Sequence, residues 1–242
     1  MISKKDIERW YSSNHYRKKS DWICIDQPKV IHEWKEKEEI GQIICAEDFK
    51  KDDWMLNYPC LEVEYKWLSL LTSKQSHPGY MIILKRPIYK ISDLLEETKV
   101  VILDGIQDPG NMGTIIRSMI AFGVDTLCLT DSCVDPFHPK SVNASTGAIS
   151  HVKVFHESHW MDWIDTAKMP VLVLDNLAHQ AIQDITKPET FILVCGSEGR
   201  GIQSKLIKSR ALTPVSIPIS DKVESLNAAM SVAIALNHIL RI

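Results

Sequence analysis

A segment that joins an apolar strand to a helix constrains this chain more than any other. The apolar run Val100–Asp104 is typical of a buried strand, and residues 111 to about 122 are expected to form a helix. Between them, Pro109 and Gly110 favour a tight turn, and Asn111 is a good N-cap residue. The segment therefore predicts a corner in which a strand turns directly into a helix.

Arg117 lies on this predicted helix, one turn from Gly113 and one turn from Ala121. Apolar residues fill the other faces of the helix. A large cation between two small residues has room to reach an anionic group. An ordinary surface arginine explains the same pattern, so the segment alone leaves both interpretations open.

The second half of the chain alternates strands with short helices. Continuous apolar runs such as Phe191–Cys195 favour a parallel sheet that is covered on both faces. The expected strands are 100–104, 125–130, 151–155, 171–174, 191–195 and 215–217. The expected helices are 111–122, 158–167, 202–209 and 225–240. This half is predicted to be a parallel α/β domain.

The first part of the chain predicts a smaller α/β unit. Residues 3–20 indicate a polar helix followed by a basic turn. Strands are expected at 22–25, 42–45, 61–65 and 80–84, and helices at 29–37 and 67–71. Polar stretches at 85–90 and 96–99 indicate a linker. We therefore predict two domains, residues 1–88 and residues 99–242.

Composition limits the class of protein. Of the 242 residues, 45% are hydrophobic and 24% are charged, as in a soluble globular protein. No apolar run reaches the roughly 18 residues of a membrane span, and the charged start lacks the apolar core of a signal peptide. The six cysteines are scattered without a Cys-x-x-Cys pair. We expect a reduced, cytoplasmic location and no membrane contact.

Charge is distributed unevenly along the chain. The net charge is −3, but residues 1–90 carry 16 Lys and Arg against 14 Asp and Glu, a difference of +2. Much of this excess lies in the first twenty residues, with Arg9, Arg17, Lys18 and Lys19 among its members. Such a patch can contact a phosphate backbone, and a solvated helix face explains it equally well.

Two further segments have the character of ligand sites. Gly196-Ser-Glu-Gly-Arg-Gly201 follows a predicted strand directly, and its bare backbone permits close approach by a ligand. Its spacing is not Gly-x-Gly-x-x-Gly, so a Rossmann dinucleotide site is disfavoured. The other segment, Ile217–Asn227, leads into an apolar helix that Ser225 or Asn227 could cap. Polar residues at such a helix start also suit a small-molecule pocket.

In this order and spacing, the three segments resemble the motifs of the SpoU/TrmH family of RNA ribose 2′-O-methyltransferases, a branch of the SPOUT superfamily. The matching motifs are Leu103-Asp…Gln107-Asp-Pro-Gly-Asn111…Arg117, Gly196-Ser-Glu198-Gly-Arg-Gly-Ile202 and Ile217-Pro-Ile…Ser225-Leu-Asn227. An accessory segment, Asp135-Pro-Phe…Pro139-Lys and Ala144–Ala148, is similar to family usage. The resemblance covers residues 99–242 strongly. Residues 1–85 resemble, more weakly, the family's ribosomal-protein-like substrate-binding domain.

The resemblance implies a fold, a partner and a cofactor. It implies a parallel α/β sheet whose C-terminal segment forms a deep trefoil knot, and a homodimer. It also implies S-adenosyl-L-methionine as methyl donor, without a metal. The residues implied as donor contacts are Gly196, Ser197, Gly201, Ile217 and Leu226.

The same resemblance assigns the catalytic group. Arg117 faces the target phosphate and helps to deprotonate the ribose hydroxyl, although the free pKa of arginine is far above neutral. Asn111 is expected to hold Arg117 or the ribose, and Glu198 and Asn227 to order the pocket; Ser225 completes the implied catalytic set. His156 and His159 are spaced unlike the His-Glu-x-x-His of zinc proteases, so no metal site is expected.

The chain departs from the family pattern at a few positions. Asp221 stands where glycine is usual, Asn143 where arginine is common, and Ala228–Met230 and Asp26-Gln27 also differ.

The front domain favours ribosomal RNA, of the large-subunit 23S type, over transfer RNA. A transfer-RNA ribose methyltransferase, a base methyltransferase and a non-catalytic RNA-binding protein are the alternatives.

Overall fold

A computed structural model describes residues 2–36, 39–74, 76–157, 160–197 and 212–240. The chain divides into two compact units, which we call unit 1 (residues 1–87 and 135–150) and unit 2 (residues 88–134 and 151–242). The predicted domain boundaries placed residues 135–150 in the second domain, whereas these residues pack within unit 1. The chain therefore passes between the units three times.

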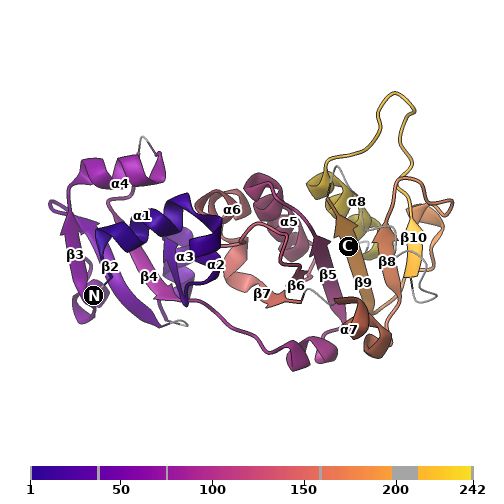
Figure 1. Ribbon diagram of the computed structural model, residues 1–242, viewed down its shortest axis with the longest axis horizontal. Helices are drawn as coiled ribbons and strands as arrows, with labels where there is room; N and C mark the ends of the chain where they lie inside the picture. Colours follow the sequence, from indigo (N-terminus) through magenta and orange to yellow (C-terminus); the bar gives the residue numbers. More distant parts are fainter. Residues whose placement is uncertain (1, 37–38, 75, 158–159, 198–211, 241–242) are drawn as a thin grey trace. The chain divides into compact units, whose positions relative to one another are not determined.

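Unit 1 is built on a four-stranded mixed sheet in the order β1-β4-β2-β3 (Figure 1). Strand β4 is antiparallel to β1 and β2, and β2 is parallel to β3. The strands are β1 (Trp22–Ile25), β2 (Ile40–Ala46), β3 (Cys60–Val63) and β4 (Tyr80–Lys85). The helices are α1 (Lys4–Ser12), α2 (Asn14–Lys18), α3 (Pro28–Trp34), α4 (Tyr65–Thr72) and α6 (Pro139–Ser145), with a 3-10 turn η1 (Asp53–Asn57) and a further 3-10 turn η3 (Ala148–His151) at the end of the 135–150 segment.

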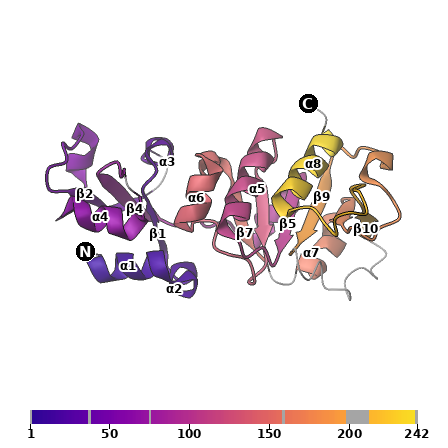
Figure 2. The ribbon, with the colours of Figure 1, turned by 90° about the horizontal axis from the view of Figure 1, so that it is seen from above.

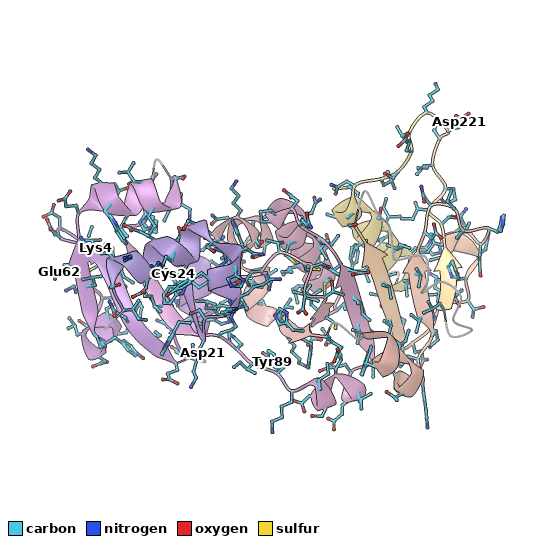
Figure 3. The ribbon with its side chains drawn as sticks, in the orientation of Figure 1. Lys4, Asp21, Cys24, Glu62, Tyr89 and Asp221 are labelled. Carbon is cyan, nitrogen blue, oxygen red and sulfur yellow. The ribbon has the colours of Figure 1, made fainter. Side chains whose placement is uncertain are left out.

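The four strands expected in this part are confirmed, and the single helix expected at 3–20 is two helices. Helix α1 ends at Ser12, and the Ser13 hydroxyl then caps α2 by accepting from the Tyr16 amide at 3.2 Å. Helices α1 and α4 pack through Ile7, Trp10 and Leu68 onto one face of the sheet. Cys24, labelled in Figure 3, lies in this core.

Unit 2 contains a six-stranded parallel sheet in the order β10-β8-β9-β5-β6-β7. Its strands are β5 (Lys99–Asp104), β6 (Thr126–Leu129), β7 (Lys153–His156), β8 (Val171–Leu174), β9 (Phe191–Gly196) and β10 (Leu212–Val215). Its helices are α5 (Pro109–Ala121), α7 (Trp160–Ala167) and α8 (Ala228–Leu240), with 3-10 turns η2 (Ile91–Glu96) and η4 (Ile182–Asp184).

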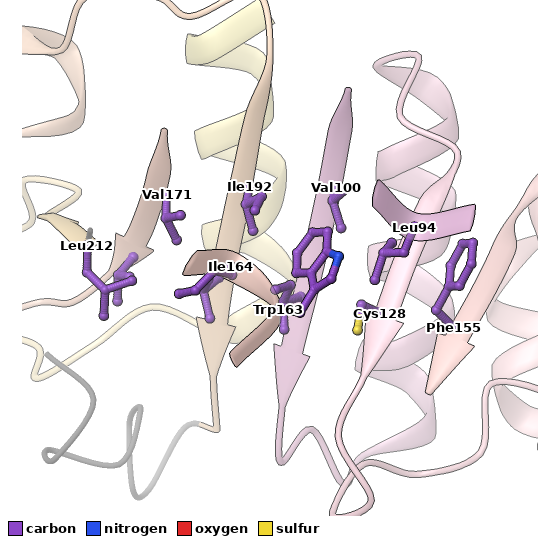
Figure 4. Close-up of a cluster of buried hydrophobic side chains, with 12 residues drawn as sticks. Leu94, Val100, Cys128, Phe155, Trp163, Ile164, Val171, Ile192 and Leu212 are labelled. Carbon is purple, nitrogen blue, oxygen red and sulfur yellow. The ribbon is translucent and has the colours of Figure 1, made fainter. Parts of the chain in front are cut away.

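Helices cover both faces of this sheet, as the continuous apolar strands predicted. Helices α5 and α8 pack against each other on one face, and α7 lies on the other (Figures 1 and 2). On the α7 face, Trp163 and Ile164 pack with Leu94 of η2 against strand residues such as Val100 and Ile192 (Figure 4). Burial on both faces explains why these strands have no polar alternation.

Several boundaries in unit 2 differ from the sequence predictions, among them β7, expected at 151–155, and α8, expected from 225. The last strand was expected at 215–217, but β10 is Leu212–Val215 and includes Pro214. Proline cannot donate to a ladder, and β10 tolerates it because it is an edge strand. Helix α5 begins at Pro109, so its N-cap is Asp108 and not Asn111. The helix expected at 202–209 lies outside the described residues.

The strand order places the three motifs at one edge of the sheet. From β5 the chain adds β6 and β7 on one side, whereas β9, β8 and β10 lie on the other. Asp104 at the end of β5 is opposite Gly196 at the end of β9. In parallel sheets, ligands bind at the carboxyl ends of strands where the order reverses. This edge is therefore the candidate site.

Candidate active site

The first motif forms a turn and the start of α5. The Asp108 carboxylate accepts a hydrogen bond from the Asn111 amide at 2.7 Å, and Pro109 occupies the first helical position, where no amide donor is needed. Because Asp108 supplies the cap, the Asn111 side chain is not used for it. Its Oδ1 instead accepts a hydrogen bond from Asn227 Nδ2 at 3.0 Å.

Arg117 lies two turns further along α5. The apolar face of this helix, including Ile115, Ile116 and Met119, is buried against the unit 2 core, whereas Arg117 is exposed. Within the described part of the chain, Arg117 forms no hydrogen bond or ion pair. Its guanidinium is therefore free to meet an anion such as a phosphate.

The second motif starts at the end of β9. Gly196 closes the strand, and Ser197 lies beside Gly105, which follows β5. Gly105 has φ +82°, and a β-carbon there would lie 3.5 Å from the Ser197 β-carbon. The ends of β5 and β9 thus approach closely at this glycine. Glu198 and Gly201, the other predicted site residues of this motif, lie outside the described residues.

The third motif is a loop that returns to the start of α5. Asn227 Oδ1 accepts from the amides of Ala229 at 3.0 Å and Met230 at 3.3 Å, so of the two expected cap residues, Ser225 and Asn227, it is Asn227 that caps α8. Ser225 is exposed, and Ile217 and Leu226 are half-buried. Asp221 lies near the tip of this loop (Figure 3).

A residue that the sequence analysis did not select anchors the same loop. Asn176, directly after β8, donates from Nδ2 to the Glu224 carbonyl at 3.0 Å. At the other end of the loop, the Ser216 amide donates to the Gln180 carbonyl at 2.8 Å. The only signal in the sequence is a polar amide just beyond the apolar run Val171–Leu174.

The structure therefore brings part of the predicted site together. Asn111 and Asn227 are bonded directly, and Gly196 and Ser197 lie at the adjoining strand ends. Among the described residues, no group of three or more His, Cys, Asp or Glu side chains could hold a metal ion. Within that same part of the chain, no helix is long and apolar enough to cross a membrane.

The four basic residues chosen near the N-terminus do not share one environment. Arg9 and Lys19 are exposed and Lys18 is half-buried, but Arg17 is only 3% exposed. Its guanidinium donates to the Trp10 carbonyl and lies 3.4 Å from the buried Asp135 carboxylate. Its charge is thus used inside unit 1, which removes Arg17 from the candidates for RNA contact.

A sequence profile of the SpoU rRNA methylase family matches residues 98–237. The chain belongs to this SpoU family. The match spans all three motifs and both asparagines that the structure joins.

Two individual relatives of this SpoU family member are both named as RNA methyltransferases. RlmP of Bacillus subtilis strain 168, named a 23S rRNA (guanosine(2553)-2′-O)-methyltransferase, is 26% identical over 240 residues, which cover 97% of this chain and 94% of RlmP. An uncharacterized tRNA/rRNA methyltransferase of Mycobacterium ulcerans is 31% identical over 196 residues, which cover 76% of this chain and 62% of that protein.

Two crystal structures of methyltransferases have the same fold. The AdoMet-bound rRNA methyltransferase of Sinorhizobium meliloti superimposes with a TM-score of 0.86 at 22% identity, over 98% of this chain and 93% of that one. The SpoU methyltransferase AviRb of Streptomyces viridochromogenes superimposes with a TM-score of 0.85 at 19% identity, over 98% of this chain and 96% of that one. The chain thus has the fold of these two methyltransferases.

Proposed function

We propose that this chain transfers a methyl group from S-adenosyl-L-methionine to the 2′-hydroxyl of a ribose in ribosomal RNA, of the 23S type. The observation that carries the proposal is the hydrogen bond from Asn227 to Asn111, which joins the first and third motifs of a SpoU family member at one edge of the sheet. The relative RlmP, similar over nearly the whole chain, is named for the same reaction.

The residues at this edge suit the methyl donor. S-adenosylmethionine combines an apolar adenine face with polar groups, and small-molecule sites of this kind are lined by apolar side chains and backbone groups. Ile217 and Leu226 are half-buried on the loop, and Gly196 and Ser197 end β9. With Gly201, these residues are the proposed donor contacts. When bound, the donor supplies an electrophilic methyl group.

Arg117 is the proposed catalytic residue. A ribose hydroxyl is a poor nucleophile, so transfer needs proton removal and alignment with the donor. The exposed Arg117 guanidinium offers a planar fork that can bind the adjacent phosphate with two hydrogen bonds. In this position the cation orients the hydroxyl and helps its deprotonation by stabilising the negative charge that develops on the oxygen, while the proton passes to solvent.

The remaining motif residues support this group. Asn111 and Asn227 fix the starts of α5 and α8 relative to each other through their side-chain bond. Ser225, two residues before Asn227, faces solvent at the same helix start. We propose that Ser225 contacts substrate or donor there, and that Glu198 helps to order the pocket.

Unit 1 is the proposed RNA-binding unit, of the ribosomal-protein-like type. Arg9, Lys18 and Lys19 are its proposed phosphate contacts. Arg9 and Lys19 are exposed and Lys18 is half-buried, and exposed cations lower the free energy of binding to a polyanion by releasing counterions. None of the six cysteines is in a disulfide and five of them are buried, which favours a reduced location such as the cytoplasm.

We also propose a homodimer and a trefoil knot in unit 2. Met230 and Ile234 are one turn apart on α8 and are 52% and 42% exposed, although both are large and apolar. A second copy that covers this face would bury them. For the knot, the support is the family together with the return of the chain after β10 to pack α8 against α5. Ile234→Glu should shift the sedimentation coefficient to that of a monomer.

The reaction is tested by methyl transfer from labelled S-adenosylmethionine to stable RNAs, followed by mapping of ribose methylation in cells with and without the gene. Wild-type protein should methylate ribosomal RNA at a ribose. Arg117→Ala should lose at least a hundredfold in rate, and Arg117→Lys should remain strongly impaired because it lacks the guanidinium fork. Lys90→Ala, an exposed cation outside the motifs, is the control. Unchanged methylation in Arg117→Ala would overturn the assignment of Arg117.

A further inference from the structure

A buried hydroxyl lies beneath the first and second motifs. Thr130 follows β6 and is only 6% exposed. Its Oγ1 lies 3.1 Å from Asp104 Oδ1, 2.8 Å from the Ser132 hydroxyl and 3.3 Å from the Gly105 amide nitrogen. Neither Thr130 nor Ser132 belongs to a motif that the proposed function uses.

The proton positions follow from the types of group present. An ionised Asp104 carboxylate can only accept, so Thr130 donates its one proton to Asp104. The Gly105 amide and the Ser132 hydroxyl then donate to the two lone pairs of Thr130. A hydroxyl has one donor and two acceptor sites, and here all three are used. Cys133 Sγ is 3.7 Å away, but it donates to the Leu103 carbonyl at 3.1 Å.

The backbone holds this hydroxyl in place. The Thr130 amide donates to the Leu103 carbonyl at 3.2 Å, and the Val134 amide donates to the Ile106 carbonyl at 2.7 Å. The loops that follow β5 and β6 are therefore bonded together on both sides of the hydroxyl. A side chain fixed in this way has little rotational freedom left to lose, so its hydrogen bonds are pre-organised.

The bonded turn is the one that meets the second motif. The Gly105 amide donates a hydrogen bond to Thr130. Gly105 has a left-handed φ of +82° and lies against Ser197. Residues 105–108 then lead directly into the cap of α5, which carries Asn111 and Arg117. A shift of the Asp104-Gly105 turn would therefore move both the proposed donor site and the proposed catalytic helix start.

We propose that Thr130 is a positioning residue for methyl transfer, whose hydroxyl fixes the Asp104-Gly105 turn against Ser197. The inference rests on the proposed function, since it assigns Thr130 a role in that reaction. It goes beyond that function because Thr130 is not among the residues proposed to contact the donor or the RNA.

The test compares Thr130→Val with Thr130→Ser. Valine has the shape of threonine without the hydroxyl, and serine retains the hydroxyl. Thr126→Val is a matched control, because Thr126 is also a buried threonine at β6 whose Oγ1 is hydrogen-bonded, to Glu97 at 3.0 Å and Asp125 at 3.2 Å, at the opposite end of the strand. The measurements are urea unfolding, calorimetric titration with S-adenosylmethionine, and kcat and KM for methyl transfer.

We expect both valine variants to lower the urea midpoint by similar amounts. Only Thr130→Val should weaken donor binding, by at least fivefold, and lower kcat/KM by at least tenfold. Thr130→Ser should restore kcat/KM to within about threefold of wild type. Equal activity of Thr130→Val and Thr126→Val would overturn the inference, as would loss in Thr130→Ser equal to that in Thr130→Val. A wild-type protein without methyl transfer to RNA would instead overturn the proposed function.

Discussion

The side chain of Asn227 donates a hydrogen bond from Nδ2 to Oδ1 of Asn111 at 3.0 Å, across 116 residues of sequence. Its own Oδ1 accepts from the first amides of α8. One amide group therefore both caps a helix and joins that helix start to the start of α5. The two roles use different atoms, so they can be separated by substitution.

Asn227→Asp should separate them. Aspartate is as good an N-cap as asparagine, and its charge favours a helix N-terminus, so the free energy of unfolding should change by less than about 0.5 kcal/mol. The donor to Asn111 is lost and two acceptor oxygens then face each other, so kcat/KM should fall about tenfold, equivalent to about 1.4 kcal/mol. In Asn227→Ser, the serine also caps the helix but adds no charge, and kcat/KM should fall by a similar factor. Wild-type kcat/KM in both variants would contradict this account.

Asn176→Ala should loosen the loop that carries the third motif. The variant removes the donor to the Glu224 carbonyl, which lies next to Ser225 and Leu226. The loop must then be ordered when the donor binds, so KM for S-adenosylmethionine should rise about three- to tenfold with kcat changed less than twofold. Gln183→Ala, an exposed amide in η4, is the control. An equal KM for both variants would show that Asn176 does not order the loop.

The ion pair between Arg86 and Asp135 should be a large source of stability within unit 1. Arg86 donates to the two carboxylate oxygens of Asp135 at 3.1 and 2.9 Å, and Asp135 is fully buried. Burial alone would raise the pKa of Asp135, but the hydrogen bonds and charge of Arg86, the Phe137 amide and the Arg17 charge together hold the pKa below its ordinary value. Asp135→Asn leaves buried guanidinium charge without its partner, which costs about 3–5 kcal/mol.

Urea unfolding measures this loss. The comparison is Lys85→Ala, which breaks a pair with Glu39 that is 3.4 Å long and whose side chains are 53% and 64% exposed. Exposed pairs contribute about 0–1 kcal/mol, so Lys85→Ala should be nearly neutral. If Asp135→Asn unfolds at the same urea concentration as Lys85→Ala, the buried pair does not stabilise unit 1.

His138 should make the stability of unit 1 depend on pH. Its Nδ1 accepts from the Lys140 amide at 3.1 Å, which only a neutral imidazole can do, and burial, with the nearby Arg17 charge, lowers its pKa to about 4. The unfolded chain takes up this proton near pH 6.5, so stability should fall as pH decreases from about 6.5 to about 4. His138→Asn keeps an acceptor for Lys140 and should reduce this slope, measured by urea midpoints at pH 7 and 5. His32→Asn, an exposed histidine on α3, is the control, and an equal slope for both variants would contradict the role of His138.

Exposed and buried cations near the N-terminus should affect RNA binding differently. Arg9→Ala and Lys19→Ala should each reduce the slope of log K against log salt by about one, at unchanged stability. Arg17→Ala should instead destabilise unit 1, because it removes a partner of the buried Asp135. Filter binding of ribosomal RNA fragments between 50 and 200 mM salt measures the slope. Unchanged slopes for Arg9→Ala and Lys19→Ala would show that helices α1 and α2 do not provide the RNA contact.

Local interactions explain what could be predicted from the sequence. Strands such as Val171–Leu174 and Phe191–Gly196 were predicted because continuous apolar runs have few other stable solutions in a parallel sheet. A cap of α8 by Ser225 or Asn227 was also predicted, since capping involves residues two or three positions apart, and the structure shows Asn227 in this role. The α5 cap was misplaced by three residues, because Asp108 and Asn111 are both good caps and only the course of the turn distinguishes them.

Long-range packing decided the rest. Helix α6 and its segment 135–150 were not assigned to unit 1, because the ion pairs that hold them join positions 49 and more residues apart. Arg17 had the sequence context of an RNA-binding cation, but its guanidinium is buried in an ion pair with Asp135. Thr130 and Asn176 belong to no recognised motif, and their roles follow only from the groups that the fold places beside them.

By itself, the sequence determined the apolar strands, the turn before α5, and three motifs specific enough to indicate the family, because these depend on residue type and short spacing. Only the tertiary structure decided that Asn227 meets Asn111, that Arg17 is buried and that Thr130 lies beneath the motif turns. The physical reason is that a hydrogen bond or ion pair between distant residues depends on strand order and packing, which no local pattern specifies.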